Sequence, residues 1–314
     1  CTHFAFIIMT LHTFSSLLKH TIAFRTNSRR ILPVLTIMSS FSNNAPSTLT
    51  GSPTAVLVPP GQCQFNDDFQ TVKLMDRFPV SATSSVLRFS LPDETKPLNL
   101  STCACILAKA KTANDPEAVI RPYTPISTNQ QVGSFDLLVK NYGASGKMSK
   151  HLCQDMAVGD SLEFKHIDFN VKIQAPFPHK KVGMIVGGTG LTPMVQALHA
   201  ILGSKAPVAQ ESVAMLYGSR DSKDILGKDL VDAWAKENDK FSVTHVLSNE
   251  PEDSNWKGER GFITKELIQK HFPGPDEEGI IIFVCGPPPM YNALCGPREE
   301  KDEVKGILGE LRYK

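Results

Sequence analysis

The segment Arg121-Pro122-Tyr123-Thr124-Pro125-Ile126-Ser127 combines side chains that suit a phosphorylated aromatic ligand. An arginine guanidinium can hold a phosphate through two parallel hydrogen bonds, and a tyrosine offers an aromatic face with a polar tip. Threonine and serine add short hydroxyl donors. On its own the segment fits equally well a turn at a sheet edge with an exposed arginine. It indicates a site only if further motifs support it.

A second stretch with possible chemistry is Gly146-Lys147-Met148-Ser149. Gly146 permits a backbone turn that other residues resist, and Ser149 could cap a helix expected near residues 149–156. The first N–H groups of a helix have no partner within it, so they can bind an anion. The alternative is an ordinary capped helix without a ligand.

Residues 182–194 have the pattern of a buried strand, a glycine-rich turn and a helix. The apolar run Val182–Val186 predicts the strand, Gly187-Gly188-Thr189-Gly190 predicts the turn, and Pro193 is expected at the first helical position. Such a turn aims N–H groups and a helix dipole at a pyrophosphate. Because the third glycine of the full dinucleotide fingerprint is missing, a glycine turn without a ligand is the alternative.

The fourth stretch is Cys285-Gly286-Pro287-Pro288-Pro289-Met290, which follows an apolar run from Ile282. Three prolines stiffen the chain beyond the strand, so the thiol is held at the strand end. A buried cysteine that packs as a small apolar side chain is the alternative.

Two kinds of element surround these stretches. Between Gln64 and Asp168, short β-rich runs separated by turn signals predict an antiparallel barrel or sandwich. From Lys180 onward, strands alternate with helices, which is typical of a parallel sheet with crossover helices. The expected barrel strands are 70–75, 86–90, 104–108, 134–139 and 161–165, and the Arg121 stretch closes a further strand. The expected strands of the second half are 182–186, 212–217, 241–247 and 279–285, with helices at 193–203, 226–238, 264–271 and from about 289.

In such parallel sheets, ligands lie at the carboxyl ends of the strands. The turns after Val186 and Cys285 both lie at that edge. We therefore expect the third and fourth stretches to meet.

Composition excludes several classes of protein. The 314 residues suggest two domains, with 41% apolar and 21% charged residues. Of 33 basic residues, four precede Asp67, the first acidic one, which leaves 29 basic against 32 acidic residues in the remainder. That balance argues against nucleic-acid binding. The seven scattered cysteines, including Cys103 and Cys105, are expected to be reduced thiols, and no metal-ligand cluster or acid–base triad stands out.

Residues 1–45 are apolar, basic and rich in serine and threonine, without an acidic residue. That composition is typical of an organellar targeting segment, and its apolar runs are too short to span a bilayer. The alternative is a segment with no targeting role. Residues 46–63 are expected to be a linker, residues 64–175 the barrel domain and residues 176–314 the α/β domain.

Together, the four stretches resemble the NADH-cytochrome b5 reductase family, within the wider ferredoxin reductase-like flavoproteins. R-P-Y-T-P-I-S is similar to the family's flavin motif, G-K-M-S to its FAD pyrophosphate loop, and G-G-T-G-L-T-P-M and C-G-P-P-P-M to its two nicotinamide-nucleotide motifs. The order and spacing also match, over about residues 68–314. One departure is Ser101-Thr102-Cys103-Ala104-Cys105, which stands where the family usually has Gly-Gln-His.

The resemblance implies a barrel that binds FAD. Arg121 would bind the pyrophosphate, Tyr123 would stack near the isoalloxazine, and Thr124 would hydrogen-bond near flavin N5. Lys140 and Tyr142 would flank the flavin's adenylate and ring regions. The implied flavin-binding residues are Arg121, Pro122, Tyr123, Thr124, Ser127, Lys140, Tyr142, Gly146, Lys147, Met148 and Ser149.

The resemblance also implies an α/β domain that binds NADH. Thr192 would touch the flavin, and Cys285 would lie beside the nicotinamide, so Thr124 and Cys285 are the implied catalytic residues. The implied nucleotide-binding residues are Gly188, Thr189, Gly190, Thr192, Asp224, Gly286, Pro287 and Met290. Asp224 matches a family carboxylate that disfavours the 2′-phosphate of NADPH, although Arg220 is nearby. NADH is therefore expected over NADPH.

The implied reaction is hydride transfer from NADH to FAD, followed by single-electron transfer to a haem protein, with cytochrome b5 first among the acceptors. Two alternatives stay open: a reductase of this fold for ferric chelates or a nitrate reductase-like partner, and a flavin-less interaction protein. The N-terminal composition favours a mitochondrial location with membrane association, and the endoplasmic reticulum membrane facing the cytosol is the alternative.

Overall fold

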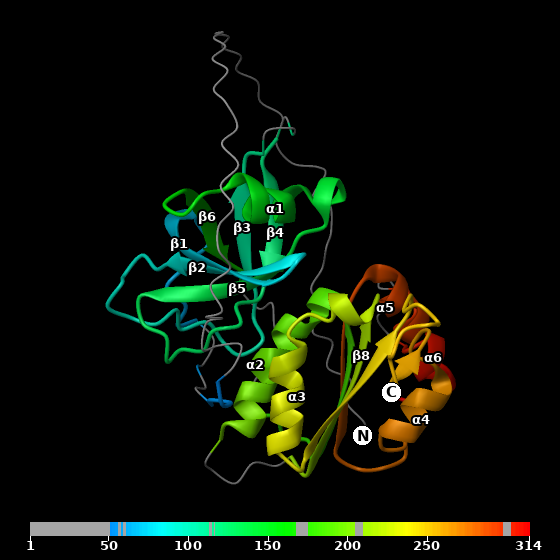
Figure 1. Ribbon diagram of the computed structural model, residues 1–314. Helices are drawn as coiled ribbons and strands as arrows, with labels where there is room; N and C mark the ends of the chain where they lie inside the picture. The colour runs from blue at the N-terminus through cyan, green and yellow to red at the C-terminus, as the bar shows by residue number, and fades with distance from the viewer. Residues whose placement is uncertain are drawn as a thin grey trace.

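The computed structural model describes residues 51–55, 58, 61–112, 115, 117–167, 175–204, 210–297 and 303–314. Two sheets form two domains in this part of the chain (Figure 1). The expected targeting segment 1–45 lies outside the described residues. None of the described helices is long and apolar enough to cross a membrane.

The first sheet is antiparallel, with six strands in the order β4-β3-β6-β1-β2-β5. Their bounds are β1 (Gln70–Ser81), β2 (Ser84–Ser90), β3 (Ile106–Ala110), β4 (Val119–Tyr123), β5 (Ser134–Lys140) and β6 (Ser161–His166). A short helical segment lies between β5 and β6, made of η2 (Gly143–Ser145), α1 (Lys147–Lys150) and the π-turn η3 (His151–Asp155).

The long strand β1 bends this sheet into the predicted barrel. Its first four residues pair with β6 and the rest pair with β2, and the pairing with β2 contains two register shifts. The two edge strands then meet, because the N–H of Ile126, beyond β4, donates to Asp136 O on β5 at 2.9 Å. Four buried phenylalanines fill the interior with ring centroids 5.0–5.9 Å apart, namely Phe65, Phe89, Phe135 and Phe164. Edge-to-face contacts of this kind add to the energy of burial.

The second sheet is parallel, with five strands in the order β10-β9-β8-β7-β11. Its strands are β7 (Lys181–Gly187), β8 (Ser212–Ser219), β9 (Phe241–Leu247), β10 (Glu259–Arg260) and β11 (Ile280–Cys285). Its α-helices are α2 (Leu191–Leu202), α3 (Lys228–Glu237), α4 (Lys265–His271), α5 (Pro288–Cys295) and α6 (Gly306–Glu310). Two short 3₁₀ turns complete it, η4 (Gly188–Gly190) and η5 (Ser222–Asp224).

Helices cover both faces of this parallel sheet. In Figure 1, α2 and α3 lie on the side of the barrel, and α4, α5 and α6 lie on the opposite side. Alternating strand residues follow this division: Met184 and Met215 share a cluster with α2 and α3, and Ile185 and Leu216 share one with α4 to α6. Because β7 has β8 on one side and β11 on the other, the direction of winding reverses between β7 and β11. That reversal is where open α/β sheets bind ligands.

Most predicted elements are present, and several bounds differ. Strand β3 starts at Ile106 rather than 104, because Cys103 has a left-handed φ of 67° in a turn. Cys103 and Cys105 are not joined in a disulfide, in keeping with the expected reduced thiols. Helix α3 starts at Lys228 because Gly227, also with positive φ, precedes it. The sequence patterns did not predict β10 or α6.

Part of the expected linker is bonded to the α/β domain. Trp234 Nε1 donates to Gly51 O at 2.8 Å, and the N–H of Thr54 donates to His199 Nδ1 at 2.9 Å. We call residues 51–55 the strap. The strap lies against α2 and α3, whose side chains His199 and Trp234 also stack edge to face at 4.8 Å. The barrel is thus connected to the α/β domain on both sides of its sequence.

The strap contact predicts a pH dependence of stability. Burial lowers the pKa of His199 to about 4. The added proton would also have to bind at Nδ1, which already accepts the hydrogen bond from the Thr54 N–H. The unfolded chain takes up this proton below its ordinary pKa of about 6.5. The free energy of unfolding should therefore fall by about 2 kcal/mol between pH 7 and pH 5 through this residue.

Urea unfolding of the parent chain and of His199→Gln at both pH values checks this. The glutamine carbonyl can still accept the Thr54 N–H but does not titrate. The variant should lose less stability on acidification. Equal losses in the two proteins would contradict the assignment.

Candidate functional site

The third and fourth stretches meet, as expected, at the carboxyl ends of β7 and β11. A Cβ on Gly190 would lie only 2.5 Å from the carbonyl carbon of Cys285 and closer still to its oxygen. A Cβ on Gly187 would lie 2.7 Å from both Pro287 Cδ and Met290 Sδ. Only glycine allows the two turns to approach this closely, so these glycines are required to pack the two turns together.

The turn after β7 is held by side chains that the motif does not include. Gly188 has a φ of 51° with open space where a Cβ would stand. The buried Tyr217 hydroxyl lies 3.2 Å from the Gly188 carbonyl oxygen and 2.9 Å from the Leu226 carbonyl oxygen, so the two carbonyls share its one hydrogen. Burial raises the pKa of Tyr217, so the hydroxyl keeps its proton. Tyr217 is a functional residue that a strand pattern cannot reveal.

Helix α2 begins two residues earlier than predicted. It starts at Leu191, so Pro193 occupies its third position rather than its first. A proline is still tolerated there because the first four N–H groups of a helix lack partners within it. Thr192 is buried at this end, and its hydroxyl donates to Thr189 O at 3.3 Å.

In the barrel, the Arg121 stretch lies at the end of β4 and in the segment that follows. Thr124 and Ser127 are buried, with 3% and 8% of their surface exposed. Ser127 Oγ accepts from the N–H of Asp136 at 3.0 Å, so this side chain ties the segment to β5. Burial raises the pKa of Tyr123, whose ring packs against the barrel core. Arg121 Nη1 donates to Ile120 O at 2.7 Å.

The loop at Gly146 forms a cradle that a side chain would fill. A Cβ on Gly146 would collide with Ser149 Oγ and lie 2.7 Å from Tyr142 Cβ. The predicted cap at Ser149 was wrong, because Gly146 is the capping residue and Ser149 lies inside α1. The Ser149 hydroxyl instead accepts from the N–H of Tyr142 at 3.3 Å and donates to Gly146 O at 3.1 Å.

Basic residues from two barrel elements gather beside this cradle. Lys147 forms an ion pair with Asp115. The pKa of Asp115 is lowered chiefly by this hydrogen bond to Lys147, then by Thr112, with a contribution from Arg121. Arg121 and Lys147 therefore lie around the same carboxylate. A glycine cradle beside two cations fits the diphosphate of a dinucleotide.

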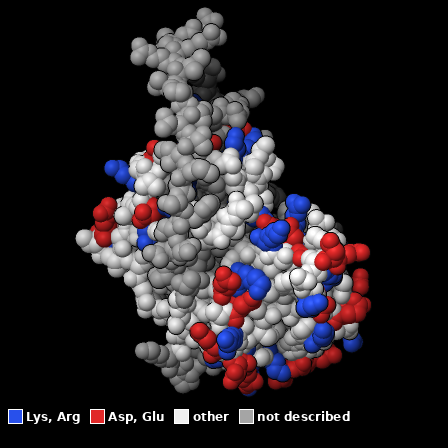
Figure 2. Space-filling view, viewed as in Figure 1, with Lys and Arg blue, Asp and Glu red and all other residues white. Residues whose placement is uncertain are grey.

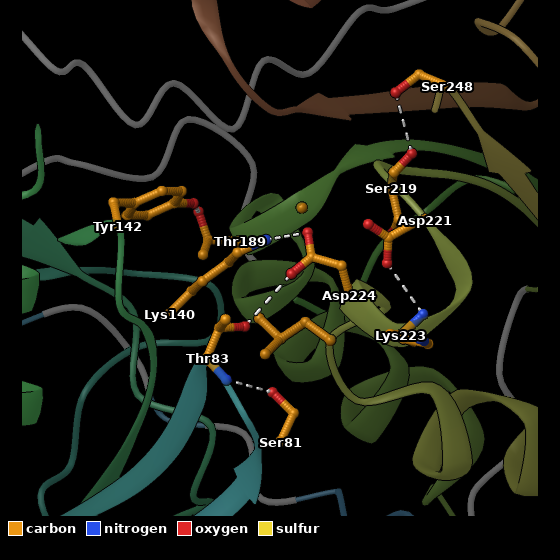
Figure 3. Close-up of polar contacts among 12 residues, drawn as sticks. Ser81, Thr83, Lys140, Tyr142, Thr189, Ser219, Asp221, Lys223, Asp224 and Ser248 are labelled. Carbon is orange, nitrogen blue, oxygen red and sulfur yellow. Dashed lines mark hydrogen bonds and ion pairs between the residues drawn. The ribbon is translucent and has the colours of Figure 1, made fainter. Parts of the chain in front are cut away.

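Polar side chains join the two domains near the glycine turn (Figure 3). Lys140 on β5 forms an ion pair with Asp224 at the end of η5. Thr83 Oγ1 contacts the second oxygen of Asp224 at 3.3 Å, and the Tyr142 hydroxyl lies 3.3 Å from the Thr189 hydroxyl. The structure thus places Lys140, which was expected near the flavin, in contact with Asp224, which was expected to favour NADH over NADPH.

A carboxylate that the motifs missed holds the loop that carries Asp224. Glu250, beyond β9, accepts from the N–H of Ser222 at 2.6 Å and from its hydroxyl at 2.9 Å. These hydrogen bonds, chiefly the backbone one, lower the pKa of Glu250. Asp221 caps the same turn by accepting from the N–H of Lys223 at 3.1 Å. The sequence signal that could have identified Glu250 is its position just after β9, at the edge of the sheet where ligands bind.

Apolar packing completes the contact between the domains. Val86, Ile126 and Leu138 of the barrel share one buried cluster with Leu191 and Met194 of α2. The departure at Ser101–Cys105 lies here too, because the Cys103 thiol contacts Pro193 O at 3.3 Å.

The described residues hold no group of three or more His, Cys, Asp or Glu side chains suited to a metal ion. On the face seen in Figure 2, basic and acidic residues are interspersed over the α/β domain. Mixed charge of this kind differs from the continuous basic surface that nucleic acid binding needs.

The close approach at Gly190 predicts a large effect of one methyl group. Gly190→Ala places a Cβ against the Cys285 backbone, which cannot rotate away, so β7 and β11 must separate at this edge. We expect a loss of about 3 kcal/mol in the free energy of unfolding. Gly218→Ala is the matched control: it is in the next strand at the same edge, and its Cβ would be 3.4 Å from the nearest atom. Similar denaturation midpoints for the two variants would contradict the packing argument.

Comparisons with known proteins agree with this geometry. Residues 71–169 match the family described as "Oxidoreductase FAD-binding domain", and residues 184–296 match "Oxidoreductase NAD-binding domain". The NADH-cytochrome b5 reductase 2 of Scheffersomyces stipitis is 35% identical over 296 residues, which cover 91% of this chain and 94% of the relative. That of Yarrowia lipolytica is 38% identical over 251 residues, which cover 79% and 84%.

A solved structure gives the same result. The cytochrome b5 reductase domain of Ulva prolifera nitrate reductase superimposes with a TM-score of 0.67 at 28% identity, over 83% of this chain and 97% of that domain. The resemblance expected from four motifs therefore extends over most of the chain and through both domains. The chain is an FAD- and NAD-binding oxidoreductase and belongs to the NADH-cytochrome b5 reductase family.

Proposed function

We propose that this chain oxidises NADH through bound FAD and passes the electrons singly to cytochrome b5. The observation that carries the proposal is the packing between the two motif sets: the glycine turn leads into α2, and Leu191 and Met194 of α2 share one buried cluster with Cys285 and with Ile126, which follows Thr124 in the barrel. Hydride transfer requires the two cofactors to be held together in one fixed geometry. The names of the fungal relatives supply the acceptor.

In this proposal, the barrel residues bind and orient the flavin. Arg121, Lys147 and the Gly146 cradle hold its diphosphate, and Tyr123 and Thr124 line the ring site. When bound, FAD accepts the hydride and releases its electrons one at a time. The chain's own work is positioning: buried Thr124 offers a short hydroxyl whose direction is limited by its packed neighbours.

On the nucleotide side, the residues at the β7 and β11 edge admit the substrate and keep water out. Gly188 and Gly190 allow its backbone contacts, and the Cys285 thiol closes the strand end with only 6% of its surface exposed. A small side chain there leaves room for the nicotinamide beside the strand end. Thr192 is buried at the start of α2, next to Pro193, whose carbonyl contacts the Cys103 thiol of the barrel.

Asp224 gives the site its preference for NADH in this proposal. Its carboxylate would repel a 2′-phosphate, and its ion pair with Lys140 also neutralises the cation that such a phosphate would need. Glu250 adds a second ionised carboxylate at the same edge.

We also propose that the chain acts at a mitochondrial membrane. The acid-free, basic and apolar composition of residues 1–45 supports this location. Fluorescence microscopy of the full chain with a C-terminal tag, against the same chain without residues 1–45, tests it. A reticular, endoplasmic pattern would refute the mitochondrial location.

The central experiment is anaerobic titration of the FAD-loaded protein with NADH, followed by addition of oxidised cytochrome b5 or a ferric chelate. Bleaching by NADH followed by faster reduction of cytochrome b5 supports the proposal. Faster reduction of the chelate would assign a different acceptor. A protein that binds no FAD after reconstitution would refute the reductase activity itself.

Arg121→Ala should weaken FAD retention about tenfold, because a charge-assisted phosphate contact is lost. The measurement is FAD release on dilution, followed by fluorescence. Arg312→Ala, an exposed change on the α/β domain, is the control and should retain FAD fully. Equal retention by both variants would remove Arg121 from the flavin site.

Asp224→Ser should raise the ratio of kcat/KM for NADPH to that for NADH about tenfold, an energy of about 1.4 kcal/mol. The serine removes the repulsion and frees Lys140 for the 2′-phosphate. Steady-state kinetics with both nucleotides measures the ratio. Asp229→Asn, which removes an exposed charge on α3, should leave it unchanged, and an unchanged ratio in Asp224→Ser would contradict this role.

A further inference from the structure

Gln196 of α2 makes a double contact across the domain interface. Its amide nitrogen donates to Pro125 O at 2.7 Å and to Ser127 O at 2.8 Å. A carboxamide nitrogen carries two hydrogens, so both are used by two carbonyls of the barrel.

Residues 125–127, which Gln196 contacts, are also hydrogen-bonded to the barrel. Between the two carbonyls, the N–H of Ile126 donates to Asp136 O at 2.9 Å, and the Asp136 N–H donates to Ser127 Oγ at 3.0 Å. The Ile126 side chain is fully buried in the cluster that includes α2. The barrel therefore holds one edge of residues 125–127, and Gln196 holds the opposite edge.

The position of Gln196 on α2 connects this grip to the nucleotide turn. Residues four apart lie on the same face of a helix. Gln196 therefore lies one turn after Thr192 on the same face of α2, the helix that begins after Gly190. The carbonyl of Pro193, in the first turn of α2, accepts from the Cys103 thiol of the barrel. One face of α2 thus carries the contacts to the barrel, and its first turn carries the nucleotide site.

We propose that Gln196 is a positioning residue for hydride transfer. It sets the distance between the nicotinamide site and the flavin site by attaching α2 to the segment that follows Thr124. This inference rests on the proposed reductase function. Two hydrogen bonds to carbonyls on either side of one residue restrict both sliding and rotation, which a single bond or an apolar contact leaves free.

A geometric role makes a specific kinetic prediction. Misplacement of two reacting groups by about 1 Å can lower a rate by as much as a hundredfold without loss of binding. Replacing the amide by an apolar side chain of similar size should therefore slow the hydride step more than it weakens NADH or FAD binding. A residue that only stabilises the fold would not separate these quantities.

The chain contains a matched control in Gln210. Its amide nitrogen also donates to two carbonyls separated by one residue, Phe177 O at 2.5 Å and His179 O at 2.9 Å. Gln210 precedes β8, so it lies at the amino edge of the sheet, opposite the site. The same substitution at both positions removes the same pair of hydrogen bonds, and only one pair joins the two domains.

The experiment compares Gln196→Met and Gln210→Met in the FAD-loaded full chain. Anaerobic stopped-flow measurement of flavin bleaching over a range of NADH concentrations separates the limiting rate from the apparent dissociation constant. We expect Gln196→Met to lower the limiting rate about tenfold or more, with FAD retained and the dissociation constant changed less than threefold. Gln210→Met should keep the parent rate, whatever its effect on urea unfolding.

Three outcomes would overturn the inference: an unchanged rate in Gln196→Met, equal rate losses in both variants, or a loss confined to the dissociation constant. If Gln196→Met fails to retain FAD, Gln196→Lys tests the same point, because an ammonium group can again donate to both carbonyls and should restore the rate. Failure of the parent protein to bleach with NADH would instead refute the proposed function.

Discussion

The arrangement of this molecule depends on the contact between α2 and the barrel. This helix begins at the glycine turn, buries Leu191 and Met194 with Val86, Ile126 and Leu138, and donates from Gln196 to the segment after β4. Apolar burial supplies most of the attraction, roughly 25 cal/mol per Å², but it has no direction. The hydrogen bonds add little net energy and instead select one orientation among many that would bury similar area.

The glycine contacts at β7 and β11 solve a different problem. The two strands are adjacent, and both chains must turn away at the same edge without blocking it. Gly187, Gly190 and Gly286 let one backbone lie against the other, with the Met290 side chain packed between the turns. Gly188, in the same turn, has open space where a Cβ would stand, so it leaves its backbone accessible to a ligand. Packing and binding therefore impose the same residue at these positions, which explains why a local motif can identify the site.

Local signals predicted the fold class, the order of elements and the meeting of the third and fourth stretches. They succeeded because alternation, helical spacing and glycine turns depend on neighbours in sequence. They failed where a side chain bonds to a residue other than the one that its local pattern suggests, whether that residue is near or distant in sequence. Ser149 has the sequence context of a cap, yet its hydroxyl bonds back to Tyr142 and Gly146. Lys140, Tyr217 and Gln196 bond to residues 9–84 positions away, and their roles could not be inferred from local pattern alone.

The strap has a mechanical consequence for the barrel. Residues 51–55 are bonded to α2 and α3 before the chain enters the barrel, and the chain returns to the α/β domain after it leaves. Both ends of the barrel sequence are therefore attached to the same domain, so the barrel is a closed loop of chain inserted into the α/β domain rather than a separate bead at one end of it. Loss of one attachment leaves the other in place, so a single broken contact does not release the barrel.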